Sequence, residues 1–278
     1  MMKLKPKTSI FILLVCACFT QECFGSGFPT GKRKTLLSPY LSYFKAVAYR
    51  DADGNKFDYG NNGKYTSLTA QLYLEHGITD RLDLVAKIPL SSARFANDYQ
   101  SNTNTTLTDL EVGLKYNFVK FNKDQYYLSG QALASVPLYG TNKNPVAGYG
   151  QFGTELKLMF SGNASERTYF NVEAGYRQYL GDKVGNVGQF TYLATSGLKI
   201  GKNNQLTGEF SGVSSYRSNL FDPQNLASNT AFTYIKATLG IGQRITGDNW
   251  IFAGVFHDVF NRNSGIGEGG MLTGIIRF

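Results

Sequence analysis

The feature that most constrains this chain is a strict alternation of apolar and polar residues. Over residues 66–78 the apolar side chains share one parity: Leu68, Ala70, Leu72, Leu74 and Ile78. The side chains of the other parity are polar: Ser67, Thr69, Gln71, Tyr73 and Glu75. Successive side chains of a β-strand point to opposite faces, so this pattern predicts a strand with one apolar and one polar face.

The alternation recurs and brings the predicted total to twelve strands. It is clear near residues 82–90, 109–118, 151–160 and 170–177. It is weaker near 36–50, 125–137, 189–200, 205–214, 230–243, 250–259 and 269–278. Short connections are expected near 79–81, 120–124, 161–167, 201–204 and 244–249. Long ones are expected near 51–64, 91–106, 138–148, 181–188, 215–229 and 260–268.

These connections indicate a barrel in an outer membrane. Short turns at one rim and long loops at the other are typical of such barrels. After residue 25, no apolar run approaches the ~18 residues that a spanning helix needs. The sequence therefore predicts an all-β fold, a transmembrane antiparallel up-and-down β-barrel of about 12 strands, with both termini in the periplasm.

A soluble β-sandwich is the alternative fold, because its strands also alternate. No Pro- or Ser-rich linker divides the chain in two. Aromatic residues gather at predicted strand ends, as at Tyr126, Tyr179 and Trp250, where membrane interfaces favour them. The composition, with 14% aromatic and 17% charged residues, also argues against a disordered chain. These observations favour the barrel.

Residues 1–25 are typical of a signal peptide. Lys3, Lys5 and Lys7 precede an apolar stretch at 9–19, and a plausible cleavage site precedes Ser26. The predicted mature chain, 26–278, would then contain no cysteine and no disulfide, because Cys16, Cys18 and Cys23 are the three cysteines of the chain. A lipoprotein signal with Cys18 lipidated is a rival interpretation. An uncleaved anchor is disfavoured because the apolar stretch is too short to span a bilayer.

Two further features indicate partners at the outer membrane. The chain ends in Phe278, preceded by apolar Leu272 and Ile276, and this ending resembles the signal recognised by outer-membrane insertion machinery, although Gly274 interrupts it. Removing residues 1–25, which hold three lysines and one glutamate, lowers the formal net charge from +8 to +6. We expect contact with outer-membrane lipid and anionic lipopolysaccharide, and no nucleic acid, because the basic residues are scattered.

Parts of the sequence resemble a known family. The residues concerned are 73–84, followed by Ile88, Pro89 and Leu90, then 108–116 and 173–177. They are similar to the outer-membrane proteins of the phenol meta-pathway (MetA-type) family, and the resemblance runs from about Leu37 to Phe278. It implies an outer-membrane barrel that passes hydrophobic or aromatic compounds. It supplies no catalytic residue.

Thirteen ionisable residues share the polar parity of their predicted strands. Ten are candidate lumen-lining residues: Glu75, Asp83, Lys87, Asp109, Glu111, Lys115, Glu155, Lys157, Glu173 and Arg177. Lys199, Glu209 and Lys236 share this parity. They predict either a lining that selects solutes or cross-strand ion pairs that fill the barrel. Because twelve strands lie between filled eight-stranded barrels and wide porins, we expect a narrow lumen.

Other motifs predict no catalytic, cofactor or metal site. Residues 265–270 match a dinucleotide fingerprint but lack a following helix, so we expect a flexible loop. Residues 51–55 resemble a calcium loop with its glycine misplaced, which favours a hairpin turn, although a weak calcium contact remains an alternative. His76 is expected outward near a periplasmic turn, and the parity of the strand with His257 is ambiguous.

The sequence therefore predicts a channel or transporter-like barrel for small, hydrophobic or aromatic solutes, and no enzyme. A non-conducting barrel that acts as a surface scaffold or adhesin is the main alternative. An outer-membrane hydrolase is a weaker one, because it needs a Ser-His pair and the chain has only two histidines.

Overall fold

The computed structural model describes residues 26–123, 125–217 and 221–278. The predicted signal peptide, with Cys18, lies outside the described residues. The strands are β1 (Thr35–Arg50), β2 (Lys56–Asp58), β3 (Lys64–Gly77), β4 (Leu82–Ala96), β5 (Ser101–Leu107), β6 (Asp109–Phe121), β7 (Tyr126–Pro137), β8 (Phe152–Ser165), β9 (Thr168–Leu180), β10 (Val187–Ile200), β11 (Asn204–Tyr216), β12 (Ala231–Thr246), β13 (Asn249–Arg262) and β14 (Ser264–Arg277), with a 3-10 turn, η1 (Leu226–Ser228), before β12. No helix among the described residues is long and apolar enough to cross a membrane.

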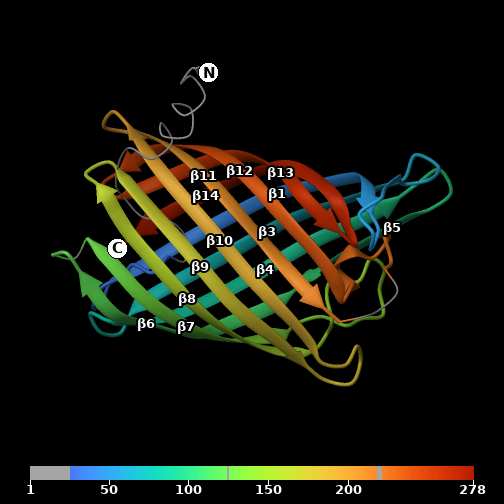
Figure 1. The fold of residues 1–278 in the computed structure, drawn as a ribbon, viewed down its shortest axis with the longest axis horizontal. Helices are drawn as coiled ribbons and strands as arrows, with labels where there is room; N and C mark the ends of the chain where they lie inside the picture. The colour runs from blue at the N-terminus through green and yellow to red at the C-terminus, as the bar shows by residue number, and fades with distance from the viewer. Residues whose placement is uncertain (1–25, 124, 218–220) are drawn as a thin grey trace, which may run out of the picture.

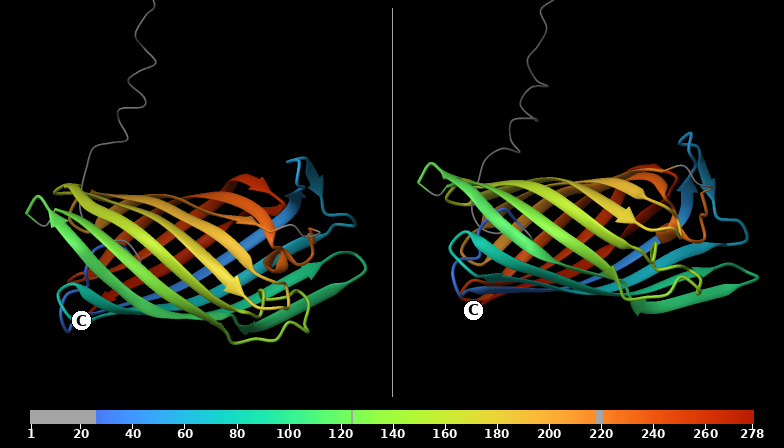
Figure 2. Two further views of the ribbon diagram at one scale, coloured as in Figure 1. Left: turned by 60° about the horizontal axis from the view of Figure 1, so that its bottom comes forward. Right: turned by 90° about the horizontal axis from the view of Figure 1, so that it is seen from below.

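Twelve of these strands form a closed antiparallel up-and-down barrel, which confirms the predicted fold class (Figure 1). Neighbours along the chain pair with each other, and β14 pairs with β1 to close the cylinder. The other two strands, β2 and β5, pair with the ends of β1 and β4. Their hairpins project from the barrel at one end (Figure 2).

The two ends of the barrel differ in the length of their connections. The long-loop end carries β2, β5 and the connections between β7 and β8, β9 and β10, and β11 and β12. At the other, short-turn end, Thr35 and Phe278 exchange two backbone hydrogen bonds of 2.7 and 3.1 Å. The start of the first strand, β1, and the end of the last strand, β14, therefore lie together at the short-turn end. An even number of antiparallel strands requires this.

The predicted long loop at 260–268 is wrong. Asn263 alone connects β13 to β14, and its φ of 46° lies in the left-handed region that asparagine tolerates. Residues 265–270, expected to be a flexible loop, belong to β14 and pair with β1. A Cβ at Gly267 would lie 2.0 Å from a ring carbon of Phe44, so the close packing of ring on backbone requires glycine there.

Two other connections are shorter than predicted because the strands continue beyond their apolar stretches. β4 extends to Ala96 and pairs with β5, so most of the predicted loop 91–106 is a hairpin. β8 extends to Ser165, which shortens the predicted turn at 161–167. Small or polar residues make up most of these extensions, so no stretch of large apolar residues on alternate positions reveals them.

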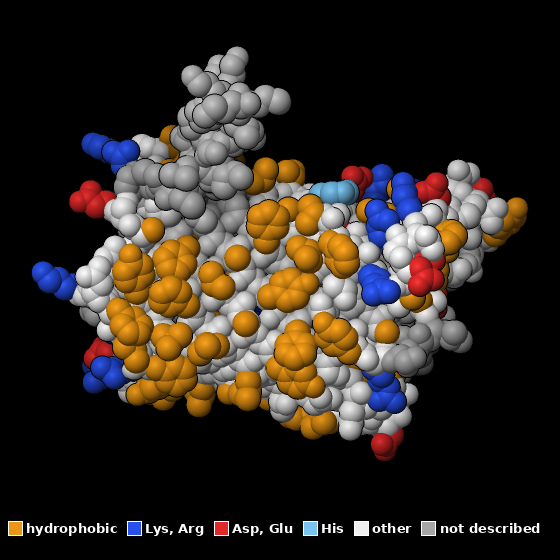
Figure 3. Space-filling model, viewed as in Figure 1, with side chains coloured by type: hydrophobic (Ala, Val, Ile, Leu, Met, Phe, Trp, Pro, Cys, Tyr) orange, Lys and Arg blue, Asp and Glu red, His pale blue; other side chains and the backbone are white. Residues whose placement is uncertain are grey.

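The two faces of the barrel wall follow the predicted alternation. Large apolar side chains are exposed on the outside, among them Leu68, Leu72, Leu84, Ile88, Leu114, Leu156, Leu158 and Val172. Hydrophobic side chains cover much of the outer wall that Figure 3 shows. Glu75 and Asp83, on the other parity, are only 3% and 1% exposed. The barrel thus has an apolar exterior and a polar interior.

The structure also decides the parity of β13, which the sequence left ambiguous. Trp250, Phe252 and Phe256 are buried inside the barrel, while Val255 and His257 lie on the outer wall. Glycines on neighbouring strands make room for the inward rings. An added Cβ would lie 2.3 Å from the Phe252 ring at position 242 and 2.6 Å from the Phe256 ring at position 269.

This register can be tested by substituting arginine for residues on the outer and on the inner face of the wall. In lipid, Leu72→Arg and Leu114→Arg should each lower the free energy of unfolding by about 2 to 4 kcal/mol, if these residues lie near the bilayer midplane. Gln71→Arg is the matched control, because Gln71 faces the interior, and its cost should be small. Reversible urea unfolding in bilayers measures all three, and the opposite order would contradict the register.

Candidate functional site

The ten ionisable residues proposed to line the interior gather in two clusters inside the barrel. The Lys115 cluster consists of Lys115, Glu75 and Asp83. The Arg177 cluster consists of Lys87, Glu111, Glu155, Lys157, Glu173 and Arg177, with Asp109 at its edge. Parity predicts that these side chains share the inner face. It does not predict which of them pair, because the partners come from strands far apart in sequence.

Lys115 is the centre of the first cluster. Its Nζ lies 2.6 Å from Glu75 Oε2 and 3.3 Å from Asp83 Oδ2. It also donates hydrogen bonds to the carbonyl oxygens of Ser26 and Phe28, at 3.2 and 2.8 Å. The side chain is 2% exposed. A buried ammonium of this kind is tolerated because carboxylates and carbonyls replace its water.

The chain segment 26–30 passes through the interior beside the Lys115 cluster, a path that no pattern in the sequence indicates. Its Gly27 amide donates to Ser161 Oγ at 2.8 Å, and Ser129 Oγ donates to the Gly27 carbonyl. Thr30 donates from its amide to Asp83 and from its hydroxyl to Glu75. Inward side chains of five strands thus hold the segment in the lumen.

The second cluster is built around Arg177 on β9. Its guanidinium donates to Glu155 Oε2 at 2.6 and 3.0 Å and to Glu111 Oε1 at 3.1 Å. Glu111 also pairs with Lys87, 2.5 Å away on β4. These contacts connect four strands across the interior. Arg177 suits this position because its fork of donors can reach two carboxylates at once.

The rest of this cluster is more loosely paired. Lys157 Nζ lies 3.7 Å from Glu155 and 3.9 Å from Glu173. Glu173 also accepts a hydrogen bond of 2.7 Å from Asn171. Lys157 therefore keeps one carboxylate neighbour when the other is removed, which distinguishes it from Lys87.

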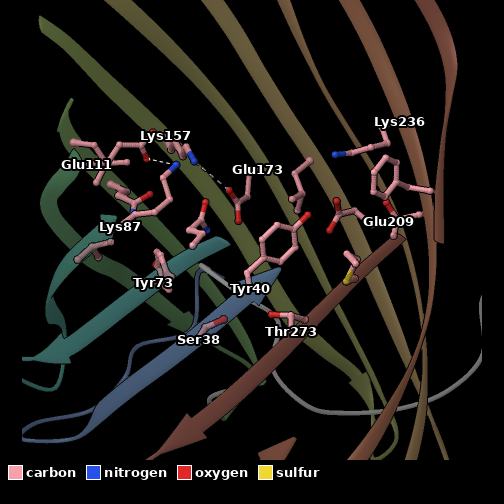
Figure 4. A pocket seen from close by; sticks show the side chains of 18 residues that line it. Ser38, Tyr40, Tyr73, Lys87, Glu111, Lys157, Glu173, Glu209, Lys236 and Thr273 are labelled. Carbon is pink, nitrogen blue, oxygen red and sulfur yellow. Dashed lines mark ion pairs between the residues drawn. The ribbon is translucent and has the colours of Figure 1, made fainter. Parts of the chain in front are cut away.

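A central cavity of about 260 Å³ adjoins the Arg177 cluster (Figure 4). Its polar lining includes Tyr40, Gln71, Lys87, Glu111, Lys157, Glu173, Glu209 and Lys236. Its apolar lining includes Val85, Leu133, Leu193, Phe256 and Met271. The charges stand on two sides, with Glu111, Lys87 and Lys157 facing Lys236 and Glu209 across the cavity (Figure 4). The cavity can hold a small solute that has both polar and apolar parts.

A second cavity, of about 370 Å³, lies toward the long-loop end and is lined by Phe44, Tyr65, Leu226, Phe232 and Tyr234 among others. It shares Lys236 with the central cavity. Two long connections come together at this end, where the Val146 amide donates to Asn225 Oδ1 at 3.0 Å. Sequence parity indicated Lys236 as inward, but nothing in the sequence marked it as the link between two cavities.

The remaining motifs form no site of their own. His76 bonds Thr35 at 2.9 Å, and His257 is exposed on the outer wall. The Asp51 carboxylate accepts hydrogen bonds from the amides of Asp53 and Asn55, so the calcium-like motif forms a turn. In the part of the chain that is described, no three histidine, cysteine or acidic residues gather as metal ligands would.

Comparison with known sequences identifies no family. No protein-family model matches the chain, and no curated protein matches it. The resemblance to the MetA-type family therefore has no confirmation from sequence.

Comparison with solved structures supports the fold. An outer membrane channel from Pseudomonas putida F1 is 13% identical, with a TM-score of 0.73 over 93% of this chain and all of that one. The NanC porin is 10% identical, with a TM-score of 0.51 over 86% of this chain and 98% of that one. The translocator domain of the autotransporter NalP from Neisseria meningitidis is 12% identical, with a TM-score of 0.51 and 89% of each chain covered. At these identities the likeness concerns the fold alone.

The Lys115 cluster makes a prediction about stability. Lys115→Met should lower the free energy of unfolding by about 3 to 5 kcal/mol, because it leaves Glu75 and Asp83 buried without their cation. Thr30→Val is the matched control, since it removes one hydrogen bond to Glu75 and leaves the ion pairs intact. Its cost should be smaller, about 1.5 to 3 kcal/mol, the usual worth of one hydrogen bond to a charged group. Equal losses for both variants in urea unfolding would contradict the assignment.

Proposed function

We propose that this protein is an outer-membrane channel that passes small solutes through the lumen of its barrel. The observation that carries the proposal is the pair of adjoining cavities inside the barrel, which share Lys236. The fold it shares with the P. putida outer membrane channel supports the same function. A channel needs space inside the wall as well as a closed wall, and the described residues provide both.

The proposed location follows from the outer wall. Exposed leucine, isoleucine, valine and phenylalanine side chains on the barrel suit a bilayer and would be unfavourable in water. Residues 1–25 would direct export as a signal peptide, and Phe278 would present the final strand to the insertion machinery. Lipid and lipopolysaccharide would contact the wall. The short-turn end would then face the periplasm and the long-loop end the outside.

The cavities limit the solute by size and polarity. A volume of about 260 Å³ lies below the range of about 300 to 1,000 Å³ typical of sites for drug-sized ligands, so the solute should be small. Apolar residues such as Leu133 and Met271 would contact a hydrophobic or aromatic part, as the MetA-type resemblance also implies. The route would run from the outer cavity to the central one and then past the segment 26–30, which has to move for a solute to leave.

One observation favours a non-conducting scaffold as the second candidate. The Arg177 cluster is cross-linked by ion pairs over four strands, as expected of residues that only fill a barrel. Both candidates share the fold and differ in whether these charges meet passing solutes.

Two variants, each of which removes one negative charge, distinguish the channel from the scaffold. Glu173→Gln should lower the preference of the channel for cations with little loss of stability, because Lys157 retains Glu155. Glu111→Gln should cost about 3 to 5 kcal/mol of stability, because Lys87 loses its only carboxylate partner within 4.0 Å in the described chain.

Reversal potentials in a salt gradient across planar bilayers measure the selectivity, and urea unfolding measures the stability. An unchanged reversal potential for Glu173→Gln in a conducting protein would contradict its role in the lining. A wild-type protein that carries no current would reject the channel and leave the scaffold.

A further inference from the structure

Lys236 differs from the other cations that line the central cavity. Lys87 has Glu111 at 2.5 Å, and Lys157 has Glu155 at 3.7 Å. No carboxylate of the described chain lies within 4.0 Å of the Lys236 ammonium, and no described protein atom accepts a hydrogen bond from it. Its contact is with the ring of Phe256, whose centroid lies 4.9 Å from Nζ.

The position of Lys236 leaves its donors facing space that a ligand can enter. The residue lines both cavities, and its nitrogen points into the central one (Figure 4). An ammonium has three N–H donors and no acceptor capacity. Since no described residue accepts a hydrogen bond from Lys236, a solute that brings an acceptor would gain a charge-assisted hydrogen bond without breaking an ion pair of the wall.

The surroundings of Lys236 define the rest of the solute. Phe256, Met271 and Leu193 give the cavity an apolar wall close to the ammonium, which suits a hydrocarbon or aromatic body. Glu209 lines the same cavity, accepts a hydrogen bond of 3.4 Å from Thr195, and forms no ion pair in the described chain. Its negative charge would oppose a second anionic group, so the site favours a single negative charge.

We propose that Lys236 binds the carboxylate of a small, monoanionic and partly apolar solute, such as an aromatic carboxylate. The proposal deepens the proposed function, because binding at Lys236 would be a step in passage between the two cavities. Binding at Lys236 would also make the channel selective among aromatic compounds, since a neutral compound of the same size would bring no negative charge to the ammonium.

The test measures binding of benzoate, with benzyl alcohol as a neutral probe of similar size, to the purified protein by calorimetry. Lys236→Gln should weaken benzoate binding about tenfold or more, the effect of losing one charge-assisted hydrogen bond, and should change benzyl alcohol binding much less, because its neutral hydroxyl accepts a weaker hydrogen bond from the ammonium. Lys236→Arg should retain benzoate binding because it keeps the charge. Lys45→Gln, on the outer wall, is the control for a lost lysine charge and should bind like the wild type.

Glu209→Gln should tighten benzoate binding, because it removes the opposing charge and keeps the volume of the side chain. This opposite sign keeps the test valid even if Lys236→Gln does not fold. The proposal is wrong if the wild type binds benzoate no better than benzyl alcohol. It is equally wrong if Glu209→Gln weakens benzoate binding, or if a folded Lys236→Gln binds benzoate like the wild type.

Bilayer currents recorded on the same samples keep this proposal apart from the proposed function. Benzoate binding that depends on Lys236, in a protein that carries no current, would support the site and reject the channel. Current without benzoate binding would support the channel and reject the site.

Discussion

The structure depends on one constraint, which is that charges enclosed by the barrel must find partners inside it. Pairing of β14 with β1 closes the wall and turns alternate residues of every strand inward. Burying an unpaired charge costs several kcal/mol of folding free energy, because the charge loses its hydration. The interior meets this constraint with pairs between strands, such as Lys115 with Glu75 and Arg177 with Glu155. The same contacts that fill the barrel therefore also hold its opposite walls together.

This pairing determines where solutes can be bound. At the short-turn end, Lys115 holds the segment 26–30 as well as its two carboxylates, so little room is left there. In the middle, the Arg177 cluster occupies one side of the interior and leaves a cavity on the other. Phe256 of β13, which lies against Gly269 of β14, forms part of the far wall of that cavity. Lys236 lies where this wall meets the outer cavity; it forms no ion pair within 4.0 Å in the described chain, and the carboxylates of Glu209 and Asp258, which line the same two cavities, act on its charge from farther away.

The sequence predicts the barrel well because a two-residue period decides which face each side chain occupies. It thus predicted the twelve strands and the inner face for Glu111 and Lys157. It failed where the period carries no information. The polar extensions of strands were predicted as loops. The glycines at 265–270 led to the prediction of a loop where the structure has strand β14. Pairing across the lumen and the path of 26–30 depend on residues far apart in sequence, so no local pattern encodes them. Parity predicted that Lys236 faces inward, but only the structure shows that its contact is with an aromatic ring.

The central claim is that solutes pass through the lumen and meet the central cavity. Cysteines placed at Met271, which lines this cavity, and at its neighbour Leu272, which is exposed on the outer wall, test it directly. The chain's three natural cysteines lie within residues 1–23, so protein without residues 1–25 presents only the introduced thiol. We predict that a charged methanethiosulfonate reagent lowers the bilayer current of Met271→Cys and leaves that of Leu272→Cys unchanged. An unchanged current after complete modification of Met271→Cys would contradict passage through the lumen.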